Sequence, residues 1–97
     1  MYARVTTAIA KPDKFDEVLK IIRDSILPAA KKQKGFKGFY DLADRNTGKG
    51  ILIVLWDTEA DMKAGESSGY YREQVAKVAP LLLGAPTLER FEVSVQG

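Results

Sequence analysis

The stretch Ile51-Leu52-Ile53-Val54-Leu55-Trp56 decides the fold, because it places six apolar residues in a row. Its length, and the turn-forming residues 44–49 before it, predict a strand over Gly50 to Trp56. Successive side chains of a strand point to opposite faces of the sheet, so an antiparallel strand with one face in water alternates apolar and polar residues. This strand does not alternate, and we therefore expect both of its faces to be covered.

Three further strands are predicted around this one. Residues 2–10 alternate between two sides with the period of a strand, and residues 88–95 do the same. Residues 36–43, with aromatic side chains, form a strand at an edge of the sheet. The turn sequence Asp44-Arg45-Asn46-Thr47-Gly48-Lys49 joins this edge strand to the apolar strand as a hairpin.

The first helical region follows Asp13, whose side chain suits a helix cap. It carries one apolar stripe at helical spacing, formed by Phe15, Val18, Leu19, Ile22 and Ile26. Pro28 is predicted to kink or end this helix, and Lys34-Gly35 closes it.

The second helical region opens at Thr58-Glu59-Ala60-Asp61, which resembles a capping box with Asp in place of Glu. Gly65 and Gly69 are predicted to divide this region into a short piece and a longer helix. The longer helix covers residues 70–79, and Pro80 stops it.

The order of elements is β-α-β-β-α-β, which predicts one domain over residues 1–97 with an α+β, ferredoxin-like fold. Right-handed crossovers then give a four-stranded antiparallel sheet with both helices on one face. On the other face, Ile51, Ile53 and Leu55 would lose about 1.5–3 kcal/mol each in water, and a small domain has only about 5–15 kcal/mol of stability. We therefore expect a homodimer, a dimeric α+β barrel in which an identical sheet covers this face. The alternative is partial cover by Leu81-Leu82-Leu83.

Composition excludes several classes of function. The 97 residues include neither Cys nor His, which removes disulfides, Cys–His nucleophile pairs and zinc sites built on thiolate or imidazole.

No apolar run approaches the roughly 20 residues of a membrane span, and the N-terminus lacks the charged start and apolar centre of a signal peptide. We expect a cytoplasmic protein with no membrane partner.

The charge pattern predicts neither a nucleic-acid partner nor a metal. The formal net charge is +2 with acids and bases interspersed, whereas nucleic-acid binders gather their cations in a patch. The basic stretch from Lys31 to Lys37 falls at the end of the first predicted helix, where cations offset the helix dipole; an anion site is the alternative. The carboxylates between Asp41 and Asp61 fall mostly at turns and helix starts and follow no oxygen-ligand motif.

Three segments resemble one known family. They are Lys34-Gly35-Phe36-Lys37-Gly38-Phe39, Asp44-Arg45-Asn46-Thr47-Gly48 and Leu55-Trp56-Asp57-Thr58-Glu59-Ala60-Asp61-Met62. With the order of elements, they are similar to the antibiotic-biosynthesis-monooxygenase-like family of dimeric α+β barrels. The resemblance spans nearly the whole chain and implies the fold and the dimer. The family includes cofactor-free oxygenases and haem-degrading enzymes, so the resemblance leaves the chemistry open.

These two branches of the family differ in the residues they use. The haem-degrading branch uses an Asn on the first strand, a Trp ending the third strand and a His on the second helical region. Trp56 matches, but Val5 and Val75 fall near the other two positions and the chain has no His, so we do not expect this route. The cofactor-free branch uses the same Trp, an Asn four residues before it, and nearby Tyr and Arg. Here the residue four before Trp56 is Leu52.

The resemblance therefore implies a cofactor-independent monooxygenase acting on an aromatic or polyketide-like small molecule in a mainly apolar pocket. The predicted substrate-binding residues are Trp56, Tyr71 and Arg72. Each also has an ordinary structural interpretation: a core aromatic, a core or rim residue, and a surface charge. No cofactor is expected, and the sequence identifies no catalytic base. The alternatives are a non-catalytic small-molecule-binding or stress-response protein of the same fold, and an isomerase or cyclase.

Overall fold

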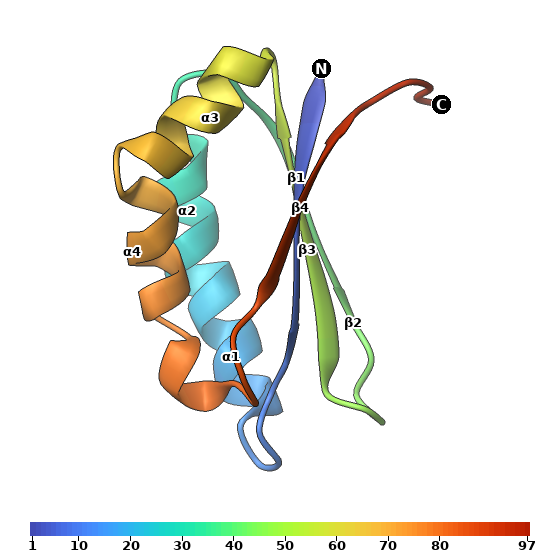
Figure 1. Cartoon of the computed structure of the whole chain (residues 1–97). Coiled ribbons are helices and arrows are strands. Elements are labelled where there is room, and N and C mark those ends of the chain that lie inside the picture. The colour runs from blue at the N-terminus through green and yellow to red at the C-terminus, as the bar shows by residue number, and fades with distance from the viewer.

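Four strands form one antiparallel sheet in the order β2-β3-β1-β4 (Figure 1). The computed structural model describes residues 1–97. The strands are β1 (Tyr2–Ile9), β2 (Phe36–Ala43), β3 (Lys49–Trp56) and β4 (Thr87–Glu92). The helices are α1 (Phe15–Ile21), α2 (Leu27–Lys31), α3 (Glu59–Ser67) and α4 (Tyr70–Ala76), with a π-helical turn over Ile22–Ile26 and a 3₁₀ turn over Ala79–Leu81. The predicted ferredoxin-like order of elements is confirmed, with β2 at an edge of the sheet.

All four helices lie on one face of the sheet, and no element of the chain lies over the other face (Figure 1). The pleat therefore gives each strand a covered face and an open face. In the register of the sheet, Leu52 of β3 lies opposite Thr6 of β1 and Asp41 of β2 on the covered face. One residue further along β3, Ile53 lies opposite Val5 and Tyr40 on the open face.

The first helical region continues past Pro28 as far as Lys31, so the proline does not end it. A proline inside a helix lacks the N–H donor, and its ring collides with the carbonyl one turn earlier. Here the preceding turn is π-helical, with the Leu27 N–H donating to the Ile22 carbonyl five residues back. This wider turn accommodates the proline, and the resulting continuous helix runs along the covered face.

The second helical region begins as the sequence predicts, because the Thr58 side chain accepts a hydrogen bond from the Asp61 N–H at 3.1 Å. Gly69 separates α3 from α4 with a φ of 89°, a left-handed conformation that favours glycine. The expectation that Gly65 also divides the region is wrong, since Gly65 is buried inside α3. A Cβ at Gly65 would lie 3.4 Å from the Tyr70 ring, so the missing side chain lets the two helices approach.

Leu82 belongs to the core on the covered side, which argues against the predicted alternative that Leu81-Leu82-Leu83 covers the open face; the homodimer stays a prediction. Leu82 forms an isolated bridge with Ala10 and packs against Val18 of α1. The Leu81-Leu82-Leu83 segment therefore leaves the centre of the open face without cover, and Ile53 remains partly exposed. None of the helices has both the length and the apolar character that crossing a membrane requires.

Candidate functional site

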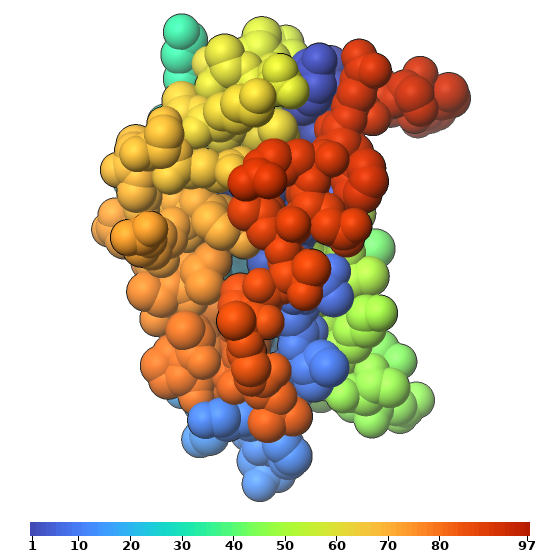
Figure 2. Space-filling view, in the orientation of Figure 1, coloured from blue at the N-terminus to red at the C-terminus, as the bar shows by residue number.

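An apolar cavity of about 90 Å³ lies between the helices and the covered face of the sheet. That volume has room for several water-sized groups. Hydrophobic residues make up 15 of the 22 lining positions. These 15 include Tyr70 and Tyr71, whose hydroxyls are polar, and the other polar or ionisable lining side chains are Arg4, Thr6, Asp41 and Gln74. The space-filling view shows the surface parted between α4 and the segment that leads into β4 (Figure 2).

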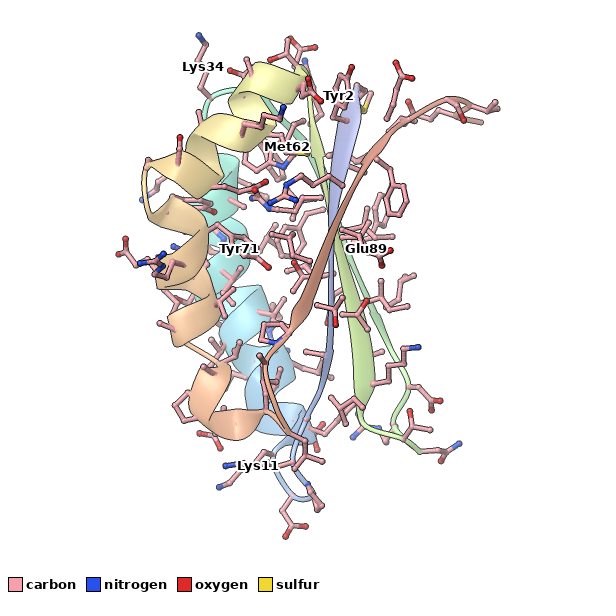
Figure 3. The ribbon with its side chains drawn as sticks, viewed as in Figure 1. Tyr2, Lys11, Lys34, Met62, Tyr71 and Glu89 are labelled. Atoms are coloured by element: carbon pink, nitrogen blue, oxygen red, sulfur yellow. The ribbon has the colours of Figure 1, made fainter.

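Tyr71 crosses from α4 to the sheet. Its side chain extends toward the strands (Figure 3), and its hydroxyl lies 2.9 Å from Oγ1 of Thr6, a hydrogen bond in which either oxygen can donate. Tyr70 also lines the cavity, and burial raises the pKa of its phenol. The two adjacent tyrosines therefore both line the cavity, and the Tyr71 hydroxyl reaches the sheet.

Arg4 is a buried cation in the central strand β1, with a side chain only 3% exposed. Its guanidinium carbon lies 5.0 Å from the centroid of the Trp56 ring and 4.7 Å from that of Tyr71, within the range of cation–π attraction. Nη1 donates to the Met62 carbonyl oxygen at 3.1 Å and to Oε2 of Glu66 at 3.5 Å. Burial lowers the pKa of Arg4 and Glu66 opposes that effect, but an arginine remains charged at neutral pH.

Glu66 is shared between two arginines. Arg90 of β4 donates to its Oε1 from Nε at 2.8 Å and through a second, very short contact from Nη2. Burial acts to raise the pKa of Glu66, but the hydrogen bonds and charges of Arg90 and Arg4 together hold it below its usual value. The carboxylate is therefore ionised, and the closer of its two partners is the outer arginine.

Asp41 is the acidic group of the cavity. It lies on the covered face of the edge strand β2, and its Oδ1 is 4.0 Å from the position a Cβ would take at Gly50. Burial raises the pKa of Asp41 to about 6, and no hydrogen bond or neighbouring charge lowers it again. A carboxyl with this pKa changes its protonation state close to neutral pH, which is the range in which a general base works best.

The structure places the three sequence-predicted site residues in three different environments. Tyr71 lines the cavity. Trp56 is only 1% exposed and packs with Val54 and Met62; it is not among the lining residues and is separated from the cavity by the Arg4 guanidinium that lies over its ring. Arg72 is exposed on α4 and is not among the lining residues.

Sequence reasoning missed two ionisable groups of the cavity, Arg4 and Asp41. Arg4 lies on the same side of its strand as Tyr2 and Thr6. A charged residue on a face that packs against helices is unusual, and this is the signal that would have singled out Arg4. Asp41 falls inside the predicted strand 36–43, away from the turns that explain the other acids. No group of three or more acidic, Cys or His side chains converges as a metal site in the chain.

Residues 1–94 match the family model described as antibiotic biosynthesis monooxygenase, so the chain belongs to this family. One relative, the uncharacterized protein Rv2557 of Mycobacterium tuberculosis, is 32% identical over 98 residues. The match covers 97% of this chain and 41% of the relative. The chain thus spans about two-fifths of the length of the curated relatives it matches.

Two solved structures with similar folds are named for different functions, one for oxygenation and one for heme degradation. The monooxygenase from the gene ActVA-Orf6 of Streptomyces coelicolor, in complex with nanaomycin D, has a TM-score of 0.77 and 14% identity, covering 93% of this chain and 84% of that one. The heme-degrader MhuD of Mycobacterium tuberculosis, with two hemes bound, has a TM-score of 0.76 and 17% identity, covering 100% and 99%. The likeness shows the fold, and function has to be argued from the site.

Proposed function

We propose that the protein is a cofactor-independent monooxygenase for an aromatic or polyketide-like phenol, with Asp41 as its general base. One observation supports this most strongly: a carboxyl with no stabilising partner and a pKa of about 6 lines an apolar cavity. Tyr71 and Thr6 supply hydrogen-bonding oxygens to the same cavity. Membership of the family supports oxygenase chemistry in general, because the description of the family names a monooxygenase, but it does not identify the substrate or the base.

The register of the sheet sets the spacing between these groups. Asp41, Leu52 and Thr6 lie side by side on three adjacent strands, so the backbones of Asp41 and Thr6 are about 10 Å apart. Leu52 lies between them and gives the cavity an apolar contact surface on the sheet side. A ring system lying on Leu52 would present one edge to Asp41 and the other to the Tyr71 hydroxyl.

In the proposed reaction, Asp41 removes a proton from an activated ring position or phenol, leaving an electron-rich anion. That anion reacts with dioxygen to form a carbon–oxygen bond, and the peroxide breaks down by losing water. One oxygen atom remains in the product as a carbonyl and the other leaves in the water, so a CH₂ group becomes C=O with no outside reductant. The protein's contribution is to deprotonate, orient and exclude water.

The working form is a homodimer in which two open faces pack against each other. Val5, Ile51, Ile53 and Leu55 share this face with the larger exposed side chains of Tyr40, Leu42 and Phe91. Continuous apolar surface of this kind is uncommon on monomers. An isologous pair of sheets would cover it and leave the cavity on the far side of each sheet free.

Non-catalytic binding of a small apolar or aromatic molecule is the second candidate. The observation that favours it is Leu52, which lines the cavity where the cofactor-free oxygenases have an Asn and therefore offers no polar group. Native mass spectrometry of protein purified without added ligand tests this candidate. A co-purifying small molecule together with no oxygen chemistry would favour it.

Oxygen uptake with anthrone-type phenols tests the oxygenase proposal. We expect uptake that depends on the protein and rises with pH with a midpoint of about 6, because Asp41 must be ionised to accept a proton. Asp41→Asn should lose about 100-fold or more in kcat/KM. Asp57→Asn is the matched control, since Asp57 is exposed and does not line the cavity. No uptake over a broad panel of phenols would overturn the proposal.

A further inference from the structure

We infer that the Arg4 end of the cavity binds an acidic oxygen, so that the ligand is an anion carrying a carboxylate or a phenolate. This inference rests on the proposed function in one respect, which is that the same cavity is the substrate site. It goes further by naming the charge of the ligand and the residue that recognises it.

The charges around Glu66 do not balance. Two arginines, Arg4 and Arg90, face one carboxylate. Arg90 makes the two closer contacts, whereas the Arg4–Glu66 distance is 3.5 Å, at the outer limit of a hydrogen bond. Glu66 can neutralise one arginine only, and its geometry favours Arg90. One positive charge is therefore left over, and it is the buried one.

Arg4 has hydrogen-bond donors that no protein acceptor uses. Both of its hydrogen bonds start from Nη1, so Nε and Nη2 have no acceptor in the protein. Arg4 also lines the cavity. A guanidinium presents its donors as a planar fork that matches the two oxygens of a carboxylate or a single phenolate oxygen.

The Arg4 guanidinium is surrounded largely by apolar groups. The rings of Trp56 and Tyr71 lie against the guanidinium, and the backbone of Gly65 packs close to it, since a Cβ there would be 3.7 Å from Nη1. A charge held among apolar groups has lost most of its hydration, and pairing it with an anion recovers part of that loss. A neutral ligand would recover much less.

The two ionisable ends of the cavity would also orient the ligand. Arg4 lies two residues along β1 from Thr6, and Asp41 lies two strands away, which puts the two backbones about 12 Å apart. The acidic oxygen of the ligand would be drawn to Arg4 and repelled from the ionised Asp41. The ring position that loses a proton would then face Asp41.

Binding of non-oxidisable probes tests this inference without any oxygen chemistry. Titration calorimetry at pH 8 would compare 2-naphthoate with its methyl ester, and 4-nitrophenolate with 4-nitroanisole. We expect each anion to bind about tenfold tighter or more than its neutral partner, and the pair with the larger difference identifies the preferred acidic oxygen. Equal affinity within both pairs, or no binding by any probe, would overturn the inference.

Variants of the charge cluster give changes of opposite sign. Glu66→Gln should tighten binding of the anions several-fold, because it removes the competing carboxylate. Arg90→Met should weaken it, because Glu66 is then free to pair with Arg4. Arg4→Met should abolish the preference for anions, and if that variant does not fold, the first two decide. Arg23→Met, an exposed arginine paired with Asp24, is the control and should change nothing.

The outcomes also separate this inference from the oxygenase proposal. A clear preference for anions with no oxygen uptake from any phenol would leave Arg4 as an anion-binding residue in a non-catalytic site. Oxygen uptake without any preference for anions, or an anion affinity that Glu66→Gln leaves unchanged, would remove the role of Arg4 while the oxygenase proposal stands.

Discussion

The two faces of the sheet are made by the same four strands, yet they differ in the side chains they carry. The covered face holds Arg4, Thr6 and Asp41 among apolar residues and lines a cavity. The open face is apolar at the centre, with Ile53 and Leu55 partly exposed. Buried polar groups are costly unless they are used or paired. The contrast fits our proposals that the substrate binds at the covered face and that a second copy of the chain packs on the open face.

Trp56→Ala should give the largest effect, because Trp56 is the most buried large side chain of the covered face. We expect the free energy of unfolding to fall by about 3–5 kcal/mol, as for other large-to-small changes in a core. Chemical denaturation measures this loss. A loss under about 1 kcal/mol would show that the tryptophan is not a packing residue of the covered face.

Ile53→Asp should disrupt the packing of a second subunit against the open face. Residue 53 lies at the centre of the open face, between Val5 and Tyr40, and a charge buried there between two sheets would have no partner. We expect the dissociation constant of the dimer to rise about 100-fold or more, which corresponds to about 2.7 kcal/mol. Sedimentation velocity over a concentration series measures it, with the exposed turn variant Thr47→Asp as control. A wild-type chain that is monomeric at micromolar concentration would contradict the assignment of this face.

Asp41→Asn should stabilise the folded protein at neutral pH and leave its stability unchanged in acid. The pKa of Asp41 is raised to about 6 in the folded state, so the unfolded chain releases this proton first as the pH rises. Stability is then lost between about pH 4 and 6 and stays lower above that range. Removing the carboxyl should recover about 1 kcal/mol at pH 7, a figure reduced because solvent screens a half-exposed group, and nothing at pH 3. A gain equal at both pH values would contradict this explanation.

Tyr71→Phe should have a small effect on stability, similar in size to that of Asp41→Asn at pH 7 and opposite in sign. It removes the hydroxyl that bonds to Thr6 and leaves the ring in place, so unfolding should become easier by about 0.5–1.5 kcal/mol. In a double-mutant cycle, Thr6→Val should cost less in the Tyr71→Phe background than in the wild type, because the hydrogen bond is already missing there. Strict additivity would mean that the two oxygens do not interact.

The fold could be predicted because its signals are local. The apolar run ending at Trp56, the Thr58 cap and the left-handed Gly69 each act within a few residues, and the structure has them in the predicted roles. Pro28 misled the prediction because the π-helical turn that accommodates it is not visible in the spacing of apolar residues. Gly65 misled it because its small size serves the approach of another helix.

The site was harder to predict because it depends on register between distant strands. Arg4 and Glu66 are 62 residues apart in the chain, and only the packing of α3 against β1 brings them together. Asp41 becomes a candidate base only because its strand pairs with β3 beside Leu52 and turns the carboxyl toward the helices. Tyr71 could be chosen from the sequence, whereas Trp56 and Arg72 could not be placed relative to the cavity without knowing which side of each element packs.

The central claim is that the covered face encloses an apolar cavity holding an ionisable carboxyl ready to accept a proton. Carbon-13 NMR of the Asp41 carboxyl, followed over a pH titration, tests this most directly. We expect a midpoint of about 6 and a further displacement of that midpoint when an aromatic anion occupies the cavity. A midpoint at the ordinary aspartate value of about 3.9, unmoved by any aromatic ligand, would contradict it.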